Sequence, residues 1–120
     1  MRIAIAALLC TTALQGSAKE RVVRWTSAET SKRIYKGRCP VQLILTGTIT
    51  AARAGDFSYA WKRSDGGMGP IRTVRSYRRG ETWRVREVWE VSDTTRGWAQ
   101  LWIPSEQRGS RVAHFRVHCK

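Results

Sequence analysis

Apolar and polar residues alternate one by one through much of the chain beyond residue 20. In the segment 41–50, Val41, Leu43 and Leu45 are separated by a second set of positions that contains three threonines. A period of two is typical of a β-strand with one buried face. No segment shows the 3.6-residue period of an amphipathic helix. The pattern therefore predicts an all-β protein.

Turn signals divide this pattern into about seven antiparallel strands. The strongest is Ser64-Asp65-Gly66-Gly67, because Asp-Gly tolerates the positive φ angles of a tight hairpin. The expected strands cover residues 22–25, 41–50, 57–61, 71–78, 83–91, 98–103 and 112–119. Turns at intervals of about 8 to 12 residues are typical of a β-sandwich or barrel.

The first 18 residues have the composition of an export signal. Arg2 precedes an apolar run from Ile3 to Leu14, and Gly16 and Ala18 occupy the −3 and −1 positions of a small-residue cleavage site. A transmembrane helix needs roughly 20 apolar residues, so the run is too short for an anchor. We expect residues 1–18 to be a cleaved signal peptide and residues 19–120 to form one secreted or periplasmic domain. The alternative is a short buried helix.

The cysteines indicate one disulfide. Cys10 lies inside the apolar run and leaves with the signal, and the leucines before it do not fit a lipoprotein site. Cys39 and Cys119 remain, and an even number of cysteines in an exported chain favours a disulfide over the alternative of two free thiols.

Strand parity places these two cysteines at one end of the domain. In simple up-and-down order, the strand that begins at Val41 and the strand that ends at Cys119 are the first and last of six, so they run in opposite directions. The start of one and the end of the other then lie together. A disulfide requires Cα atoms about 4.4 to 6.8 Å apart, which this arrangement allows.

The composition is strongly basic, with a formal net charge of +13. Arginine supplies 17 of the 22 basic residues. Guanidinium groups bind carboxylates and phosphates bidentately and stack on aromatic rings. This favours an anionic partner, such as an anionic polysaccharide, a lipid or an acidic protein. The alternative is that the arginines reflect a GC-rich genome and a soluble, self-repelling surface.

The chain lacks a recognisable catalytic or metal-binding motif. The nine acidic residues are scattered, and neither a nucleophile elbow nor a phosphate-binding glycine loop occurs. His114 and His118 would lie about 13 Å apart on a strand, too far to share one zinc ion. We therefore expect a non-enzyme without cofactor or metal, with both histidines on the surface.

Arginines and aromatic residues are interleaved between residues 72 and 89. Alternation from Trp83 turns Trp83, Val85 and Trp89 to one face and Arg84 and Arg86 to the other. A second strand has Ala99, Leu101 and Ile103 as expected core residues, so its tryptophans would point outward. The residues expected to bind a ligand are Arg75, Arg78, Arg79, Trp83, Arg84, Arg86, Trp98 and Trp102.

An ordered set of short motifs resembles a family of exported bacterial immunoglobulin-like domains. The set covers residues 39–119 and comprises Cys39-Pro40, Gly47-Thr48-Ile49, Tyr59-Ala60-Trp61, Arg63-Ser64-Asp65-Gly66, Gly97-Trp98 and Phe115-Arg116-Val117-His118-Cys119. The resemblance implies an immunoglobulin-like β-sandwich with a terminal disulfide and brings no activity with it. In immunoglobulin domains proper the bridge joins the two sheets in the core against a tryptophan. Here the cysteines lie at strand ends.

Two functions are consistent with these features. The first is a binding module that recognises an anionic envelope or extracellular ligand through an arginine and tryptophan surface. The alternative is a structural envelope or assembly component that docks on another protein through its sheet edge or tryptophan face. The alternative to a binding role for the outward tryptophans and arginines is a stacked ladder that only stiffens the sheet. Nucleic acid is disfavoured as a partner, because the chain is expected to be exported and has no known binding motif.

Overall fold

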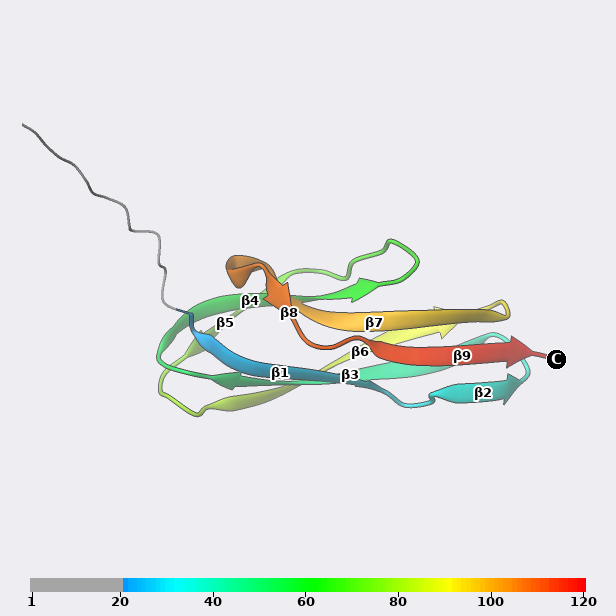
Figure 1. Cartoon of the computed structure of the whole chain (residues 1–120), viewed down its shortest axis with the longest axis horizontal. Coiled ribbons are helices and arrows are strands. Elements are labelled where there is room, and N and C mark those ends of the chain that lie inside the picture. Colours follow the sequence, from blue (N-terminus) through cyan, green and yellow to red (C-terminus); the bar gives the residue numbers. More distant parts are fainter. Residues whose placement is uncertain (1–20) are drawn as a thin grey trace, which may run out of the picture.

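A computed structural model describes residues 21–120, which form two packed β-sheets (Figure 1). The expected signal peptide, residues 1–18, lies outside the described residues. Within the described part, the strands are β1 (Val23–Thr30), β2 (Ile34–Gly37), β3 (Val41–Ala51), β4 (Gly55–Arg63), β5 (Arg72–Ser76), β6 (Thr82–Val91), β7 (Thr95–Ile103), β8 (Arg108–Gly109) and β9 (Ala113–Cys119). The 3-10 turn η2 (Pro104–Glu106) follows β7. The all-β prediction is confirmed.

The two sheets differ in size and contain different strands. The smaller sheet has the order β1-β3-β6, and all its pairs are antiparallel. The larger sheet has the order β2-β9-β7-β4-β5, with β8 paired to β7. Its edge strand β2 runs parallel to β9, beside the C-terminus (Figure 1). The chain therefore crosses between the sheets several times, and the fold is a β-sandwich.

The structure adds two short strands to the seven that alternation predicts. β2 has four residues and β8 has two, which is too short for a period of two to be recognised. β1 also continues to Thr30, beyond the predicted end at residue 25. A bulge between Val23 and Trp25 shifts the register there, and the positions that then face the core include Thr26 and Ala28. Because these inward residues of β1 are small or polar, the sequence there does not alternate between apolar and polar residues.

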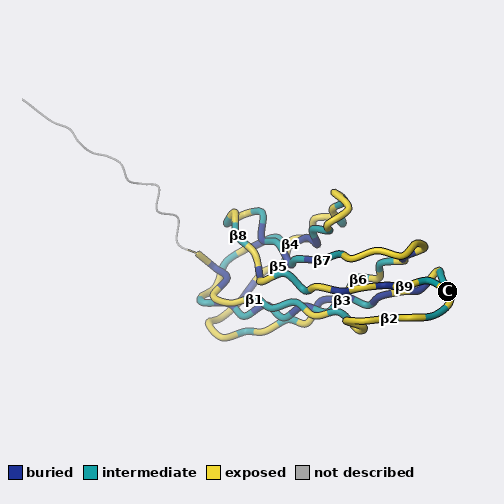
Figure 2. The backbone as a smooth tube through the Cα atoms, turned by 45° about the vertical axis from the view of Figure 1, so that its right-hand side comes forward, coloured by how far each residue is buried: buried dark blue, intermediate teal, exposed yellow. Residues whose placement is uncertain are grey.

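Strands β3 and β7 supply the centre of the core. Leu43, Leu45 and Ile49 of β3 are completely inaccessible to water, and so are Leu101 and Ile103 of β7. Burial alternates along β3 as the sequence predicts (Figure 2). Because the side-chain period of a strand is two, burial of one face of each strand turns the alternate residues to solvent.

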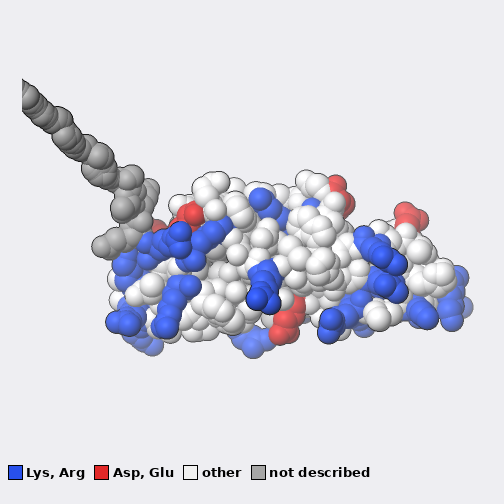
Figure 3. All heavy atoms as spheres, in the orientation of Figure 1, with Lys and Arg blue, Asp and Glu red and all other residues white. Residues whose placement is uncertain are grey.

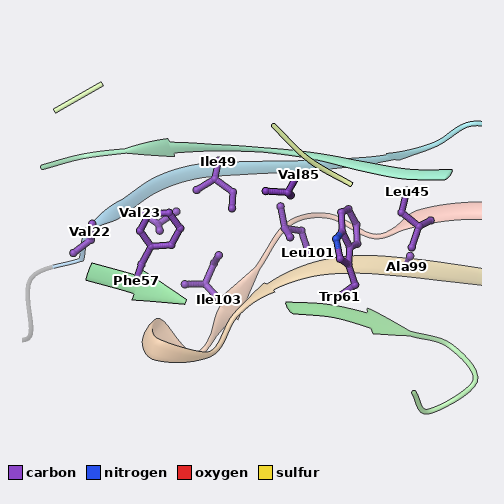
Figure 4. Close-up of a cluster of buried hydrophobic side chains, with 10 residues drawn as sticks. All are labelled: Val22, Val23, Leu45, Ile49, Phe57, Trp61, Val85, Ala99, Leu101 and Ile103. Atoms are coloured by element: carbon purple, nitrogen blue, oxygen red, sulfur yellow. The ribbon is translucent and has the colours of Figure 1, made fainter. Parts of the chain in front are cut away.

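Trp61 of β4 fills the space between the sheets at Gly47 of β3. Its ring lies beside Leu101 in the core (Figure 4). A Cβ atom at Gly47 would lie 2.6 Å from Cδ2 of Leu101 and 3.1 Å from Cη2 of Trp61. The glycine therefore provides the room that the indole ring occupies.

The disulfide closes one end of the sandwich. Cys39 precedes β3 and Cys119 ends β9, with Cα atoms 5.5 Å apart and a separation of 80 positions in the sequence. A second apolar cluster, which includes Val41, Phe115 and Val117, packs beside the bond. The predicted disulfide and the meeting of the two cysteines at one end are confirmed. The predicted count of six strands from Val41 onward is one too low, because β8 lies between β7 and β9. Trp61 belongs to the other cluster, as expected from the position of the cysteines at strand ends.

Replacing both cysteines by alanine should lower the free energy of unfolding by about 4 kcal/mol, because the bond closes a long loop in the unfolded chain. Urea unfolding of the oxidised protein and of the double variant measures the difference. Reductant should destabilise the parent by a similar amount and leave the variant unchanged. A loss below 1 kcal/mol would contradict the expectation.

Gly47→Ala should destabilise the protein by about 1 to 3 kcal/mol, since the added methyl group overpacks a site already filled by Trp61 and Leu101. Thr48→Ala is the matched control, because residue 48 lies on the outer face of the same strand. Thermal or urea unfolding compares the two. Equal effects at both positions would show that the ring does not need the glycine.

Candidate functional site

The outer face of the larger sheet carries a concentration of cationic and aromatic side chains. Because Phe115 and Val117 of β9 are buried, Arg116 and its alternate neighbours point outward. In β7, Ala99 and Leu101 are buried, so the residues that alternate with them point outward. We call the outward residues of β2, β7 and β9 the cationic face. They are Ile34, Lys36, Arg96, Trp98, Gln100, Trp102, His114, Arg116 and His118.

Strand register brings two arginines directly opposite each other. Arg96 of β7 pairs with Arg116 of β9, and Ile34 of β2 lies on the other side of Arg116. In the next outward row, Trp98 pairs with His114. The centre of the cationic face is therefore a pair of guanidinium groups beside an indole and an imidazole.

A shallow hollow of about 530 Å³ lies over this centre. It is lined by Arg33, Ile34, Arg96, Gly97, His114, Phe115 and Arg116. Arg33 comes from the turn before β2, so the hollow collects three guanidinium groups from three separate segments. The exposed side chain of Ile34 forms an apolar rim.

The strands that carry this hollow place no carboxylate beside its arginines, and the nearest acids line neighbouring hollows: Glu29 with Arg33, and Asp65, Glu90 and Asp93 with Arg96. None of the outward residues of β2, β7 and β9 is acidic. Ion pairs within residues 21–120 include Arg63–Asp65, Arg75–Asp56 and Arg108–Glu106, and none of them involves Arg33, Arg96 or Arg116. Figure 3 shows basic side chains gathered toward both ends of the molecule, one group overlying β7 and β9. Like charges directly opposite on a sheet are destabilising, so we expect the Arg96–Arg116 pair to lower the free energy of unfolding.

The two tryptophans of the cationic face have different environments. Nζ of Lys62 lies 3.6 Å from the centroid of a ring of Trp102, so this ring already has a cation stacked on it. Trp98 lies next to His114 and one row from the arginines. Trp98 is therefore the ring best placed to contact a ligand held by the arginines.

The eight residues predicted to bind a ligand lie on several surfaces. Trp98 and Trp102 lie on the cationic face, whereas Arg84 and Arg86 point outward from the smaller sheet on the opposite side. Arg75 lies on β5, where its Nη1 is 3.1 Å from Oδ1 of Asp56. The others are Arg78 and Arg79 in the turn between β5 and β6, and Trp83, which faces inward.

Trp83 packs in the core rather than on a platform. Its ring makes an edge contact with Phe57, with centroids 5.2 Å apart, and the residue is half-buried. The ring of Trp89 makes an edge contact with Phe115, with ring centroids 5.0 Å apart. These contacts confirm the expected inward face of β6.

The residues predicted from the sequence to bind a ligand do not include Arg33, Arg96, Arg116 or His114 of the hollow. Alternation did place both histidines on the surface, and His114 and His118 are indeed exposed. The same alternation from Phe115 and Val117 turns Arg116 outward. The pairing of Arg96 with Arg116 needs the register of β7 and β9, which no local pattern shows.

The described residues contain neither a cluster of metal-binding side chains nor a membrane-spanning helix. Within residues 21–120 no group of three histidine, cysteine, aspartate or glutamate side chains could hold a metal ion. In the same range no helix is long and apolar enough to cross a membrane.

No protein-family model matches the sequence, and no curated protein matches it. Solved structures are similar to it in fold. A β-glucosidase from Erythrobacter marinus is similar over 79% of this chain, with a TM-score of 0.61 and 10% identity. The CARDB domain of the PF1109 protein from Pyrococcus furiosus, solved in complex with di-metal ions, is similar over 86% of this chain and 100% of its own length, with a TM-score of 0.55 and 9% identity.

The alkylpurine DNA glycosylase AlkC from Pseudomonas fluorescens, solved with abasic-site DNA, is also similar, with a TM-score of 0.54 and 10% identity over 78% of this chain. The chain spans only 15% of the β-glucosidase and 30% of the DNA glycosylase. At such low identity these likenesses concern the fold alone. The CARDB likeness, which covers that whole domain, agrees with an immunoglobulin-like β-sandwich.

Arg116→Gln should raise the free energy of unfolding by about 0.2 to 1 kcal/mol at low salt, because it removes a cross-strand repulsion. Arg84→Gln is the control, since Arg84 faces Thr48 and the change in net charge is the same. The gain at Arg116 should shrink as salt screens the pair. Urea unfolding at two salt concentrations measures both variants, and equal gains would show that the pair is not repulsive.

Proposed function

We propose that this protein is a non-catalytic immunoglobulin-like module that binds an anionic ligand on the cationic face. One observation supports this above all others. Arg96 and Arg116 lie opposite each other beside Arg33, without a carboxylate among the outward residues of their strands. Two like charges in direct cross-strand contact lower the stability of the folded state. Such a loss of stability is common at sites that bind a ligand, here one of opposite charge.

The chemistry of the hollow suits an oxyanion. Guanidinium groups form bidentate hydrogen bonds with carboxylate, sulfate-like and phosphate oxygens, and these bonds are among the strongest in proteins. A bound anion also relieves the repulsion between Arg96 and Arg116. Trp98 and His114, one row away, offer ring faces to the uncharged part of the same ligand.

The compartment forms part of the proposal. A disulfide between the two cysteines of the described domain is typical of an oxidising environment, which supports a periplasmic or extracellular location. The anions available there include acidic polysaccharides, lipid headgroups and acidic proteins. Of the residues predicted from sequence, the proposed site retains Trp98 and Trp102. Its arginines come from β7, from β9 and from the turn before β2.

Binding to dextran sulfate, measured by calorimetry against uncharged dextran, tests the proposal. The parent protein should bind the sulfated polymer only, and more weakly as salt increases. Arg96→Gln with Arg116→Gln should weaken binding roughly 100-fold, because hydrogen bonds between charged groups contribute about 1.5 to 3 kcal/mol each. Vesicles of phosphatidylglycerol and polyglutamate, assayed in parallel, separate the classes of anion.

Arg84→Gln with Arg86→Gln is the matched control, because it removes the same charge from the opposite sheet. It should weaken binding only slightly. If this variant lost binding and the Arg96 and Arg116 variant kept it, the ligand would lie on the smaller sheet, as the sequence alone suggests. Absence of binding to all three anions would overturn the proposed function.

A further inference from the structure

Strand β6 is a long edge strand whose outer side is open. It pairs with β3 through ten residues, and no strand of the described part pairs with its other side. The N–H of Ala51 donates to the carbonyl of Glu81, which sets the alternation of the ladder. In an antiparallel ladder, the N–H and C=O groups of Arg84, Arg86, Val88 and Glu90 then point toward the open edge. Such an edge is a template for another strand.

We propose that a second copy of this chain pairs with β6, antiparallel and centred on Val88, to form one continuous six-stranded sheet from two smaller sheets. This does not rest on the proposed function, since it uses the other sheet. In a two-fold arrangement about Val88, residues whose numbers add to 176 lie opposite each other. Arg86 of each copy then faces Glu90 of the other, and Val88 faces Val88.

The side chains on the outer face favour this register. Val88 is 52% exposed, and Ile44 of β3 lies directly beside it. Pairing would join Ile44 and Val88 of both copies into one apolar row, flanked on each side by an Arg86–Glu90 ion pair. The in-phase register centred on Arg86 places Arg86 opposite Arg86, and the one centred on Glu87 places Glu87 opposite Glu87, which is repulsive. The register centred on Trp89 forms no ion pair between the copies, because Arg86 then faces Ser92 and Glu90 faces Val88.

The inward-facing residues of β6 are also compatible with the register centred on Val88. Glu87 points inward at the edge, and a charge in this position discourages arbitrary strands from adding. In the proposed pairing, Glu87 of one copy lies opposite Trp89 of the other. The guanidinium carbon of Arg63 lies 5.1 Å from the centroid of a ring of Trp89, so a cation is already in place near that position. Glu87, whose carboxylate lies beside Gly69 of its own copy, would thus approach Arg63 of the other copy, and this contact favours a second copy over an arbitrary strand.

Sedimentation equilibrium of the disulfide-bonded protein tests this at physiological ionic strength, where charges beyond about 8 Å are screened. The protein should show a monomer–dimer equilibrium. Arg86→Glu and Glu90→Arg should each weaken association by about tenfold or more, because two ion pairs become two repulsive pairs. The double variant, with both changes, should restore it. Arg84→Glu, the matched control, should leave association unchanged, because Arg84 faces no charge in this register.

Cross-linking through a cysteine at position 88 tests the centre of the pairing. Directly opposed hydrogen-bonded residues have Cα atoms about 5.5 Å apart, within the range of a disulfide. Val88→Cys should therefore form a covalent dimer on mild oxidation. Arg84→Cys should not, since the two copies of residue 84 lie roughly 27 Å apart at 3.4 Å per residue.

A protein that stays monomeric at its highest soluble concentration would overturn the proposal. So would a dimer that is insensitive to both single charge reversals, or one that cross-links equally well from positions 84 and 88. These outcomes can be told apart from the anion test, because Arg96 and Arg116 lie on the opposite sheet. Since Arg86 belongs to the proposed pairing, the Arg84 and Arg86 control of that test is compared with the parent at a concentration where both are monomeric.

Discussion

The inner residues of β3 and β7 exclude water completely, and the direction of most other side chains follows from their burial. Leu45 lies opposite Ala99 and Ile49 above Ile103, with Leu101 and Trp61 between these pairs (Figure 4). Trp61 fills the space at Gly47. Since strand side chains alternate strictly, a shift of one residue would bury Arg96 and Trp98 and expose the core. The core thus fixes which charges reach the surface.

The two outer faces of the sandwich have different chemistry for the same reason. The outer face of the larger sheet displays Arg96, Arg116 and Trp98 without acidic neighbours on their strands, whereas the smaller sheet mixes threonines with both signs of charge. The first arrangement is suited to a ligand that brings negative charge. The second is suited to a partner with a complementary pattern, which a second copy of β6 provides. The fold keeps these two surfaces on opposite sides.

The disulfide and the core stabilise different parts of the molecule. The large apolar cluster around Trp61 holds the sheets together along most of their length, while the smaller cluster with Phe115 and Val117 lies beside Cys39 and Cys119. The cationic face overlies β9, which ends at the bond. The covalent tie therefore fixes the end of the strand that carries Arg116 to the start of β3, while Arg116 lies opposite the like charge of Arg96.

The sequence by itself determined the all-β class, the Asp65-Gly66 hairpin turn, the disulfide and the inward face of nearly every long strand, because these depend on local alternation, turn chemistry and cysteine number. Gly66 has the positive φ of 91° that the turn requires. Only the tertiary structure decided which strands share a sheet. Arg84 and Trp98 are close in sequence yet lie on opposite faces, and Arg96 and Arg116 are distant in sequence yet adjacent in space. Pairing register depends on the packing of the whole core, so the centre of the candidate site could not be predicted from any segment alone.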